Sequence, residues 1–240
     1  MKKAMILAAG RGSRLKPLTS TTPKPLLDLN GRPIIEYTLD LLKRHGFSQV
    51  VVNAHYLSGV VLEYFRERPK DSLEIQISLE QNLLGSAGGV KKMEHFLDEP
   101  FLVMCGDLIT GIDLSALRDY HYEKNGVLTV AVTEVDDPRR YGVVWADESG
   151  QITRFVEKPH SVENISSREI NMGIYIVDPS VMAVIPKWVY FDFGRDLFPL
   201  LLEMGAPMFS FKLDSYWRDL GTLDDLARER ERFESLKSSP

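Results

Sequence analysis

The sequence predicts an α/β fold, a three-layer sandwich in which helices cover both faces of a mainly parallel, mixed central sheet. Short apolar segments alternate with amphipathic helical segments through the first half of the chain, as in parallel strands joined by helices. Strand-like segments crowd the second half, with fewer helices between them. The second half therefore predicts a β-rich insertion into this sheet.

The composition suits one large or two small globular domains, and one compact domain is the simplest interpretation. The chain has 240 residues, of which 44% are hydrophobic and 26% charged, and a chain of this size can bury a substantial core. Its formal charge is -5 and its isoelectric point is near 5.6. Nucleic-acid and membrane-surface binders present net basic faces, so we expect neither partner, and any basic site must be local.

The other bulk features favour a cytoplasmic address. The apolar part of the opening MKKAMILAA is too short for a secretory signal, and no apolar run approaches the roughly 18 residues of a membrane span. Cys105 is the only cysteine, so no internal disulfide can form. The five histidines show no metal-ligand spacing, so we expect no histidine metal site.

The first half predicts four strands and three helices. The first strand covers the apolar run 4–9, which stops at Gly10, and the first helix covers 33–45, whose apolar residues recur at helical spacing before Gly46. The same patterns predict strands at 50–53, 73–79 and 101–105 and helices at 57–66 and 90–96.

The second half predicts the β-rich layer and two helices. A hairpin over 141–146 and 151–157 turns at Glu148-Ser149-Gly150. Further strands are expected at 127–135, 170–177 and 208–213, with a helix at 194–203. The last helix, 224–237, is so rich in charge that we expect a solvated face, which makes it an unfavourable surface for a homo-oligomer.

Residues 4–25, AMILAAGRGSRLKPLTSTTPKP, predict an anion site. Gly10 and Gly12 let the backbone turn so that its N–H groups approach a ligand, as in loops that hold phosphate. Arg14 can grip phosphate oxygens with two N–H groups. Lys24 lies between Pro23 and Pro25, and a residue before proline avoids the helical region, so we expect an extended backbone that aims its ammonium group.

Two generic phosphate motifs do not fit this loop. A Walker A loop requires Gly-Lys-Ser/Thr after four spacers, and a dinucleotide fingerprint requires glycine at the position of Leu15. A glycine turn with solvated basic residues remains the alternative if the loop is considered by itself. Support for a site comes from Glu80 and Asp107, which also follow predicted strands, because ligands bind beyond the carboxyl ends of strands in open α/β sheets.

Six motifs in order along the chain resemble the sugar-1-phosphate nucleotidyltransferases, also called nucleoside-diphosphate-sugar pyrophosphorylases. The opening motif is Gly10-Arg11-Gly12-Ser13-Arg14 followed after nine residues by Lys24, with Ser13 where threonine is commoner. The others are Gly85-Ser86-Ala87-Gly88, Gly106-Asp107, Tyr141-Gly142-Val143, Val156-Glu157-Lys158-Pro159 and Trp217-Arg218-Asp219-Leu220-Gly221. Each motif alone is weak evidence for this family, but six motifs in the family order are strong evidence.

The resemblance implies a Rossmann-like fold with a sugar-binding insertion, and an enzyme that joins a nucleoside triphosphate to a sugar 1-phosphate. It implies that Arg14 holds the triphosphate, that Lys24 bridges the α-phosphate and the sugar phosphate, and that Asp107 acts in catalysis. Asp107 and Asp219 are the implied Mg²⁺ ligands, and carboxylates with substrate phosphates are the ligands this ion prefers. Considered without Asp219, Asp107 would be interpreted as a turn residue after Gly106.

The resemblance also implies two binding subsites. The nucleotide would contact Leu7, Ala9, Gly10, Gly12, Ser13, Arg14, Glu80, Gly85 and Ser86. The sugar phosphate would contact Gly142, Glu157, Lys158, Asn171 and Gly173, although Glu157 and Lys158 alone would read as an exposed pair at a hairpin end. A carboxylate at Glu80 can only accept hydrogen bonds, which slightly favours guanine over uracil or thymine.

Within the family, the sequence most resembles the mannose-1-phosphate guanylyltransferase branch, notably at Tyr141-Gly142-Val143-Val144 and Phe191-Asp192-Phe193-Gly194. Many relatives add a carboxyl-terminal left-handed β-helix, whereas this sequence ends soon after Asp219, so we expect no regulation through such a domain. Heptose guanylyltransferases and short uridylyltransferases or thymidylyltransferases remain alternatives. We expect one catalytic domain over 1–240, with 1–110 mainly nucleotide-binding, 111–221 mainly sugar-phosphate-binding and 222–240 a terminal helix.

Two rivals come from other classes of protein. A non-catalytic sugar-nucleotide-binding regulatory subunit of the same fold would be expected to lose one of the residues at the reacting centre, and all four are present: Arg14, Lys24, Asp107 and Asp219. A nicotinamide-dependent oxidoreductase requires the third glycine and the ribose-binding acid that are missing here. The sequence therefore predicts catalysis, with homo-oligomerisation open.

Overall fold

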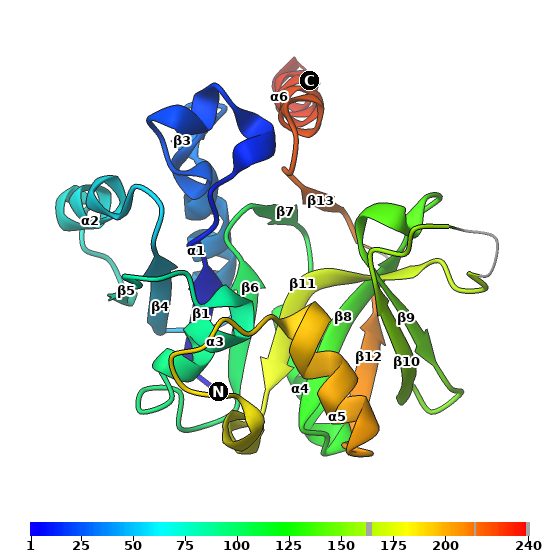
Figure 1. The fold of residues 1–240 in the computed structure, drawn as a ribbon. Coiled ribbons are helices and arrows are strands. Elements are labelled where there is room, and N and C mark those ends of the chain that lie inside the picture. Colours follow the sequence, from blue (N-terminus) through cyan, green and yellow to red (C-terminus); the bar gives the residue numbers. More distant parts are fainter. Residues whose placement is uncertain (162–164, 214, 239–240) are drawn as a thin grey trace. The chain divides into compact units, whose positions relative to one another are not determined.

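The computed structural model describes residues 1–161, 165–213 and 215–238 (Figure 1). The chain folds into two compact units. The first unit comprises Met1–Met5, Leu83–Met104 and Asp113–Asp214, and the second comprises Ile6–Asn82, Cys105–Ile112 and Ser215–Pro240. The division by function at residues 110 and 221 stays a prediction.

The first unit is built on antiparallel strands around β11. Strand β11 (Glu169–Val177) pairs antiparallel with β6 (Phe101–Cys105), β8 (Leu128–Glu134) and β9 (Gly142–Ala146), while β12 (Met208–Lys212) runs parallel to β8. Strand β10 (Ile152–Glu157) completes a hairpin with β9 in which Glu157 lies opposite Gly142. The predicted hairpin is confirmed, and it brings two predicted sugar-site residues together.

The described part of the first unit contains the α-helices α3 (Gly85–Lys92), α4 (Leu114–Lys124) and α5 (Phe198–Glu203). Helix α3 begins five residues before the predicted start at residue 90, because its first five residues are glycine, serine and alanine, which show no apolar periodicity. Helix α4 was not predicted, since it buries only Leu114, Leu117 and His121. The segment predicted as one helix from residue 194 is a wide turn, Phe193–Leu197, followed by α5.

The second unit contains the parallel pair β4 (Gln49–Ala54) and β5 (Glu74–Leu79), in register from Gln49 opposite Glu74 to Ala54 opposite Leu79. Strand β1 (Lys3–Leu7) ends in this unit. Two short antiparallel pairs were not predicted, because strands this short show no alternation: β2 (Asp28–Leu29) with β3 (Arg32–Pro33), and β7 (Leu108–Thr110) with β13 (Trp217–Asp219).

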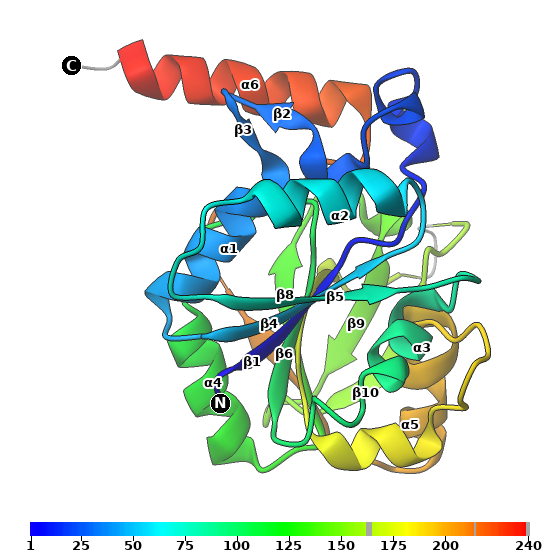
Figure 2. The same cartoon turned by 90° about the vertical axis from the view of Figure 1, so that its left-hand side faces the viewer.

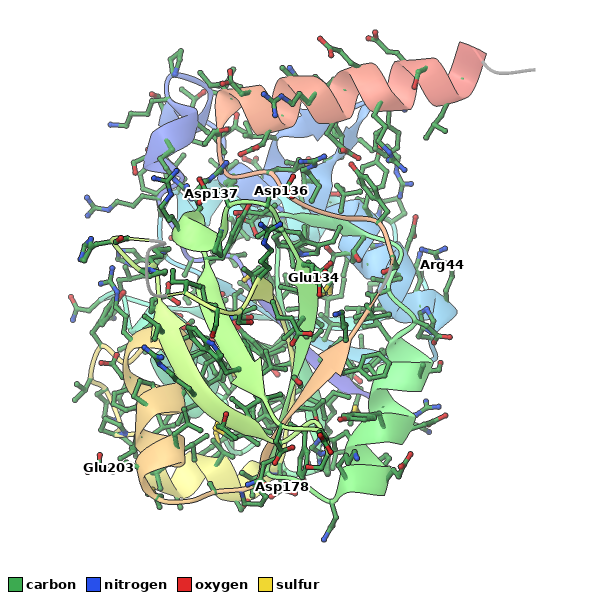
Figure 3. The ribbon with its side chains drawn as sticks, turned by 90° about the vertical axis from the view of Figure 1, so that its right-hand side faces the viewer. Arg44, Glu134, Asp136, Asp137, Asp178 and Glu203 are labelled. Atoms are coloured by element: carbon green, nitrogen blue, oxygen red, sulfur yellow. The ribbon has the colours of Figure 1, made fainter. Side chains whose placement is uncertain are left out.

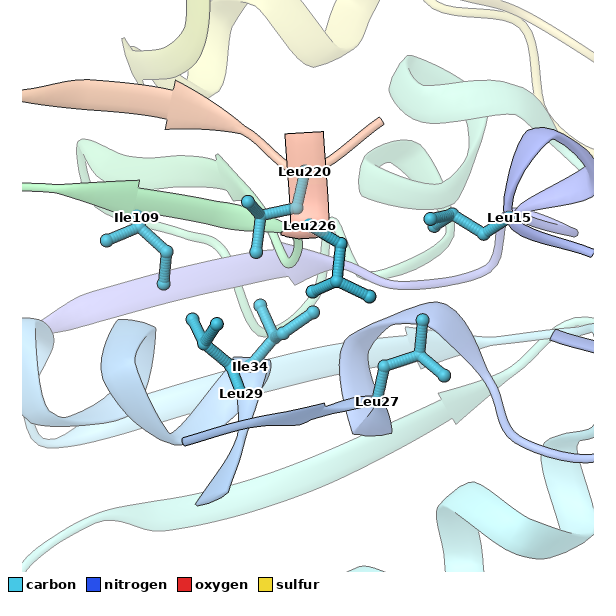
Figure 4. Close-up of a cluster of buried hydrophobic side chains, with 7 residues drawn as sticks. All are labelled: Leu15, Leu27, Leu29, Ile34, Ile109, Leu220 and Leu226. Atoms are coloured by element: carbon cyan, nitrogen blue, oxygen red, sulfur yellow. The ribbon is translucent and has the colours of Figure 1, made fainter. Parts of the chain in front are cut away.

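The second unit also contains helices α1 (Ile34–Arg44), α2 (Ser58–Glu67) and α6 (Leu223–Ser238). Figure 2 shows α6 running along β2 and β3. One buried cluster of apolar side chains joins these distant parts of the sequence (Figure 4): Leu15, Leu27, Leu29, Ile34, Ile109, Leu220 and Leu226. The cluster fixes the anion-loop residue Leu15 and the residue after Asp219 in one core.

Helix α6 has the predicted solvated face, but another side of the helix is buried. Leu226 lies in the buried cluster, and the carboxylate of Glu229 is almost fully buried, accepting hydrogen bonds from Tyr216 and Arg232. Buried charges need such partners, and the sequence pattern does not reveal them. Among the residues described, none of the helices is both long and apolar enough to span a bilayer.

Candidate functional site

The predicted anion loop is a tight turn fastened to the core. Gly12 adopts φ +59°, and a side chain there would place its Cβ 2.9 Å from the Thr19 methyl carbon. Thr19 Oγ1 donates to the Gly12 carbonyl at 2.9 Å. Residues Ser13–Leu15 form a 3-10 turn whose Leu15 side chain enters the buried cluster, while Arg14 is left exposed. The loop therefore presents a cation from a fixed backbone.

Lys24 lies at the start of a 3-10 turn, Lys24–Leu26, so the prediction of an extended backbone there is wrong. Leu26 N donates to Pro23 O at 2.8 Å and Leu27 N donates to Lys24 O at 3.1 Å. Proline is tolerated in a first helical turn because its missing N–H group has no partner to lose there. The backbone of Lys24 is thus fixed, as expected, but by the turn rather than by extension.

The ammonium group of Lys24 lies between two carboxylates of the second unit. It donates a hydrogen bond to Asp107 Oδ2 and stands 3.5 Å from Asp219 Oδ1. The β7–β13 pairing places Asp219 opposite Leu108, and Leu220 N donates to Asp107 O at 3.1 Å. Residues more than a hundred positions apart in the sequence therefore meet because two three-residue strands pair.

The charges of this group perturb one another. Burial alone lowers the pKa of Lys24, but the negative charges of Asp107 and Asp219 outweigh it, and the pKa lies above its ordinary value. Burial and the negative charge of Asp107 raise the pKa of Asp219, against the opposing effect of Lys24 and Arg14. Two carboxylates that repel each other and need cations are a recognised feature of functional sites.

Arg14 belongs to the same group of side chains. A Cβ added to Gly221 would lie 3.2 Å from Arg14 Nη2 and 3.1 Å from Asp219 Oδ2, so the guanidinium group and the carboxylate both approach this glycine. The structure thus brings together four of the predicted site residues, Arg14, Lys24, Asp107 and Asp219, in one unit. The sequence indicated Gly221 only as part of a motif. The structure shows that this glycine leaves room for the side chains of Arg14 and Asp219.

The pair Asp107 and Asp219 fits a divalent cation. Within the described ranges, no group of three or more His, Cys, Asp or Glu side chains is placed to hold a metal. Both carboxylates lie near the ammonium group of Lys24 and offer hard oxygen ligands. Two carboxylates by themselves do not complete the coordination of a divalent cation. Mg²⁺ is commonly held by one or two carboxylates, with substrate phosphates and waters as the other ligands.

The ends of β1, β4 and β5 meet through a buried polar network. Ala8 N donates to Asn53 Oδ1 at 2.6 Å, and Asn53 Nδ2 donates to Glu80 Oε1 at 2.7 Å. Gly106 N donates to Leu7 O at 3.0 Å, which ties the Gly106-Asp107 turn to the same end of β1. Asn53 was missed by sequence reasoning, although its place at the end of a predicted strand was the available signal.

The predicted nucleotide residues Gly85 and Ser86 begin α3 in the first unit. Gly85 has φ +75°, and its added Cβ would lie 2.5 Å from Phe191 O, so only glycine fits. Ser86 Oγ donates to Asp192 Oδ2 at 2.7 Å and accepts from Phe193 N at 2.9 Å. The structure therefore joins this loop to the segment Phe191–Phe193, which was not predicted to belong to either subsite.

The predicted sugar-site residue Glu157 lies against two glycines. Added Cβ atoms at Gly142 and Gly194 would lie 2.8 Å and 2.5 Å from Glu157 Oε2. Glu157 Oε1 is 3.3 Å from Lys158 Nζ. Gly194 was not predicted as a site residue, and no sequence spacing links it to Glu157.

Asn171 and Gly173 lie at an irregularity of β11. Gly173 has φ +75°, and its N–H group donates to Asn171 Oδ1 at 2.8 Å. Asn171 Nδ2 donates to the Tyr175 hydroxyl at 2.8 Å, and the register of β11 against β8 shifts between Asn171 and Tyr175. Both residues shape this bulge, and their contact with a sugar phosphate stays a prediction.

The chain belongs to the nucleotidyl transferase family, whose model matches residues 3–235. It is 40% identical to a UTP–glucose-1-phosphate uridylyltransferase of Synechocystis sp., over 93% of this chain and 61% of that protein. It is 36% identical to a mannose-1-phosphate guanyltransferase of Candida albicans, over 93% of this chain and 62% of that protein. The chain spans about three fifths of the length of these relatives.

A similar structure covers almost the whole chain. HddC from Yersinia pseudotuberculosis, which has also been solved in complex with GMP-PN, is 25% identical and superimposes with a TM-score of 0.82 over 97% of this chain and 100% of that one. The predicted α/β fold class, with a mainly parallel mixed sheet and a β-rich insertion, is confirmed, as is the predicted resemblance to sugar-1-phosphate nucleotidyltransferases.

Proposed function

We propose that the protein joins a nucleoside triphosphate to a sugar 1-phosphate, giving a nucleoside-diphosphate sugar and pyrophosphate. A phosphate oxygen of the sugar 1-phosphate attacks the α-phosphorus in line, and the bond from that phosphorus to the oxygen bridging the α- and β-phosphates breaks. The observation that carries this proposal is the placement of Lys24 between Asp107 and Asp219, with Arg14 beside Asp219.

The chemistry requires cations more than a general base. The attacking phosphate is already anionic near neutral pH, since its second pKa is about 6. The barrier lies in bringing two polyanions together and in the charge that gathers on the departing pyrophosphate. Lys24 would neutralise charge at the α-phosphate and Arg14 would hold the triphosphate, and the backbone of each residue lies in a 3-10 turn.

Asp107 and Asp219 would hold Mg²⁺ together with substrate phosphate oxygens. When bound, the ion would supply positive charge that offsets phosphate repulsion and charge on the leaving group. The carboxylates also balance Lys24 between catalytic cycles. In the first unit, Glu157 would accept hydrogen bonds from sugar hydroxyls, and Lys158, with its exposed ammonium group, would reach the sugar phosphate.

GTP and mannose 1-phosphate are the proposed substrates. Glu80 supports guanine, because a carboxylate can accept hydrogen bonds from both the N1–H and the N2–H₂ groups of that base. Relatives named mannose-1-phosphate guanyltransferases at 36% identity support the same pair.

UTP and glucose 1-phosphate are the second candidate pair. The uridylyltransferase of Synechocystis sp. is 40% identical to this chain, which is more than the 36% of the Candida albicans guanyltransferase. Uracil also offers an N–H group to a carboxylate. The two candidates share one mechanism and differ only in the base and the sugar.

The test is a pyrophosphate-release matrix of GTP, UTP, dTTP, CTP and ATP against mannose, glucose and other sugar 1-phosphates. GTP with mannose 1-phosphate should give the highest kcat/KM. The highest value for UTP with glucose 1-phosphate would replace the first candidate by the second. Nucleotide binding without pyrophosphate release from any pair would indicate a non-catalytic regulatory subunit.

The two-aspartate site is tested by Asp107→Ala and Asp219→Ala. Each should lower kcat/KM by at least about a hundredfold, as expected for loss of a preorganised electrostatic contact, and chelator in excess should abolish the wild-type reaction. The control is Asp98→Ala, which removes an exposed carboxylate paired with Lys3 and should leave the rate unchanged. Wild-type rates in either site variant, or in chelator, would contradict the proposed metal site.

A further inference from the structure

One segment of the first unit contacts both of its predicted subsites. The backbone of Phe191 lies against the loop that begins α3: Phe191 N donates to Leu84 O at 2.8 Å, and Gly88 N donates to Phe191 O at 2.9 Å. Gly85 and Gly88 have no room for side chains, since added Cβ atoms would lie 2.5 Å from Phe191 O and 2.7 Å from Val189 O. The loop and the segment therefore form one rigid backbone contact.

Asp192 is the centre of this contact. Its Oδ2 accepts from Ser86 Oγ at 2.7 Å, while its Oδ1 accepts from Gly194 N at 3.0 Å and Arg195 N at 3.2 Å. One carboxylate thus joins the α3 loop to the first turn of Phe193–Leu197. Ser86 Oγ closes the arrangement by accepting from Phe193 N at 2.9 Å.

The turn that Asp192 holds also limits Glu157. Gly194 is buried, and its added Cβ would lie 2.5 Å from Glu157 Oε2 and 3.0 Å from Glu157 Cδ. The carboxylate occupies the space that a side chain would take. A shift of this turn by a fraction of an ångström would therefore move or crowd Glu157, because packed interiors transmit small displacements.

We propose that Asp192 is a positioning residue that couples the α3 loop, through Ser86 and Gly194, to the carboxylate of Glu157. The inference rests on the proposed function, in which the loop binds the nucleotide and Glu157 binds the sugar. When the nucleotide occupies the α3 loop, the coupling favours the Glu157 geometry that accepts the sugar 1-phosphate. Such coupling is reciprocal, so binding of the sugar 1-phosphate raises the affinity for the nucleotide by the same factor.

The first test uses steady-state kinetics on Ser86→Ala, Asp192→Asn and Gly194→Ala. Ser86→Ala should raise KM for the sugar 1-phosphate by about threefold to tenfold, the loss expected for one hydrogen bond, although Ser86 lies in the nucleotide loop. Gly194→Ala should raise the same KM at least as much. Because Ser86 and Asp192 share one bond, the double variant Ser86→Ala/Asp192→Asn should be no worse than the poorer single variant.

The matched control is Asp178→Asn. Asp178 also caps a helical turn of the first unit and accepts from a serine, Ser180, but it lies where β11 ends, at the opposite end of β8 from Glu134 (Figure 3). This variant should leave both KM values unchanged. A change confined to the nucleotide KM in Ser86→Ala, or an equal sugar KM change in Asp178→Asn, would overturn the coupling.

The second test does not require turnover. Amide hydrogen exchange of the ligand-free protein should be faster in Ser86→Ala than in the wild type at residues 191–195 and also at Lys158, whose N–H group donates to Tyr141 O. Faster exchange confined to residues 84–95, with Lys158 unchanged, would overturn the coupling. A wild type that releases no pyrophosphate but shows the predicted exchange would defeat the proposed function and leave the coupling standing.

Discussion

At the scale of single residues, the candidate site is an arrangement of opposite charges held by backbone turns. Lys24 reaches Asp107 and Asp219 from a 3-10 turn, and Arg14 reaches the Gly221 side of Asp219 from another. Neither turn lies in a regular helix or strand, so each depends on a buried neighbour, Leu15 or Pro25, for its position. The charges are therefore in place before a substrate binds.

Removing the charge of Lys24 tests its role. Lys24→Met keeps the apolar stem and should lower kcat by about a hundredfold or more while changing KM for the nucleotide much less, because in the proposed mechanism the ammonium group acts where the new bond forms. Lys16→Met removes an exposed cation of the same loop and should leave kcat unchanged. A variant in which only KM rises would make Lys24 a docking charge.

Two buried threonines form a matched pair for stability. In the described structure Thr38 Oγ1 in α1 is buried without a hydrogen-bond partner, whereas Thr19 Oγ1 donates to Gly12 O. Thr38→Val should raise the free energy of unfolding by about 1 kcal/mol, since the shape is kept and an unpaired hydroxyl is removed. Thr19→Val should lower it by a similar amount and loosen the anion loop. Urea denaturation measures both changes, and a loss of stability in Thr38→Val would contradict the assignment.

At the scale of elements, the sequence predicted what long periodic segments reveal. The helix α1 and the strands β5 and β6 lie where the apolar residues placed them, because α1 buries one face, β5 alternates in exposure and β6 is a continuous buried apolar run. The pairing of β7 with β13 could not be predicted, since three residues show no period and their partner is over a hundred positions away. That pairing is what brings Asp219 to Asp107.

The candidate site shows the same limit. The motifs named Arg14, Lys24, Asp107 and Asp219, and the structure brings these four together, but their family roles stay predictions. Asn53 and Gly194 were missed because their significance lies in the side chain that each contacts, Glu80 or Glu157. Contacts of this kind depend on tertiary packing and leave no local signal.

A cluster of charges joins α1, the end of α2 and the start of β5. Arg68 donates to Glu36 and to Asp71, whose other partners are Lys43 and the N–H group of Leu73. The hydrogen bond from Arg68 is the main reason that the pKa of Asp71 lies well below its usual value, despite the opposing effect of burial. The interactions of Asp71 in this cluster therefore contribute stability only while Asp71 is ionised.

The pH dependence of stability follows from that direction. A carboxyl group with a depressed pKa contributes stability above its unfolded pKa of about 3.9, and the contribution is lost as the pH falls through the folded value. Asp71→Asn should therefore lower Tm at pH 7 by a few degrees, at about 2–4 °C per kcal/mol, and the difference from the wild type should shrink below pH 4.

Asp40→Asn is the control for this measurement. Asp40 also pairs with Lys43 but is more exposed, and exposed ion pairs contribute little to stability. Thermal unfolding monitored by circular dichroism from pH 7 to pH 3 measures both variants. A difference between Asp71→Asn and the wild type that stayed constant over this range would contradict a role for the ionised carboxylate.

At the scale of the whole molecule, a chain of formal charge -5 is proposed to bind two polyanions. Long-range attraction cannot bring such ligands to an acidic protein, so affinity must come from local cations and from Mg²⁺ bound with the nucleotide. The second unit contains Arg14, Lys24 and Glu80, which would recognise the triphosphate and the base. Nucleotide binding should therefore stabilise the protein strongly only when the metal is present.

Thermal shifts with the five nucleoside triphosphates test this expectation and the choice of base. A ligand at a hundred times its Kd stabilises the folded state by about 2.7 kcal/mol, which for a chain of this size corresponds to a rise in Tm of about 5–10 °C. GTP with Mg²⁺ should give the largest rise, and chelator should remove most of it. In Glu80→Gln the advantage of GTP over UTP should shrink, because one acceptor oxygen becomes a donor that faces the donors of guanine. The largest rise with UTP would favour the second candidate pair, and equal rises with all five nucleotides would contradict base recognition at Glu80.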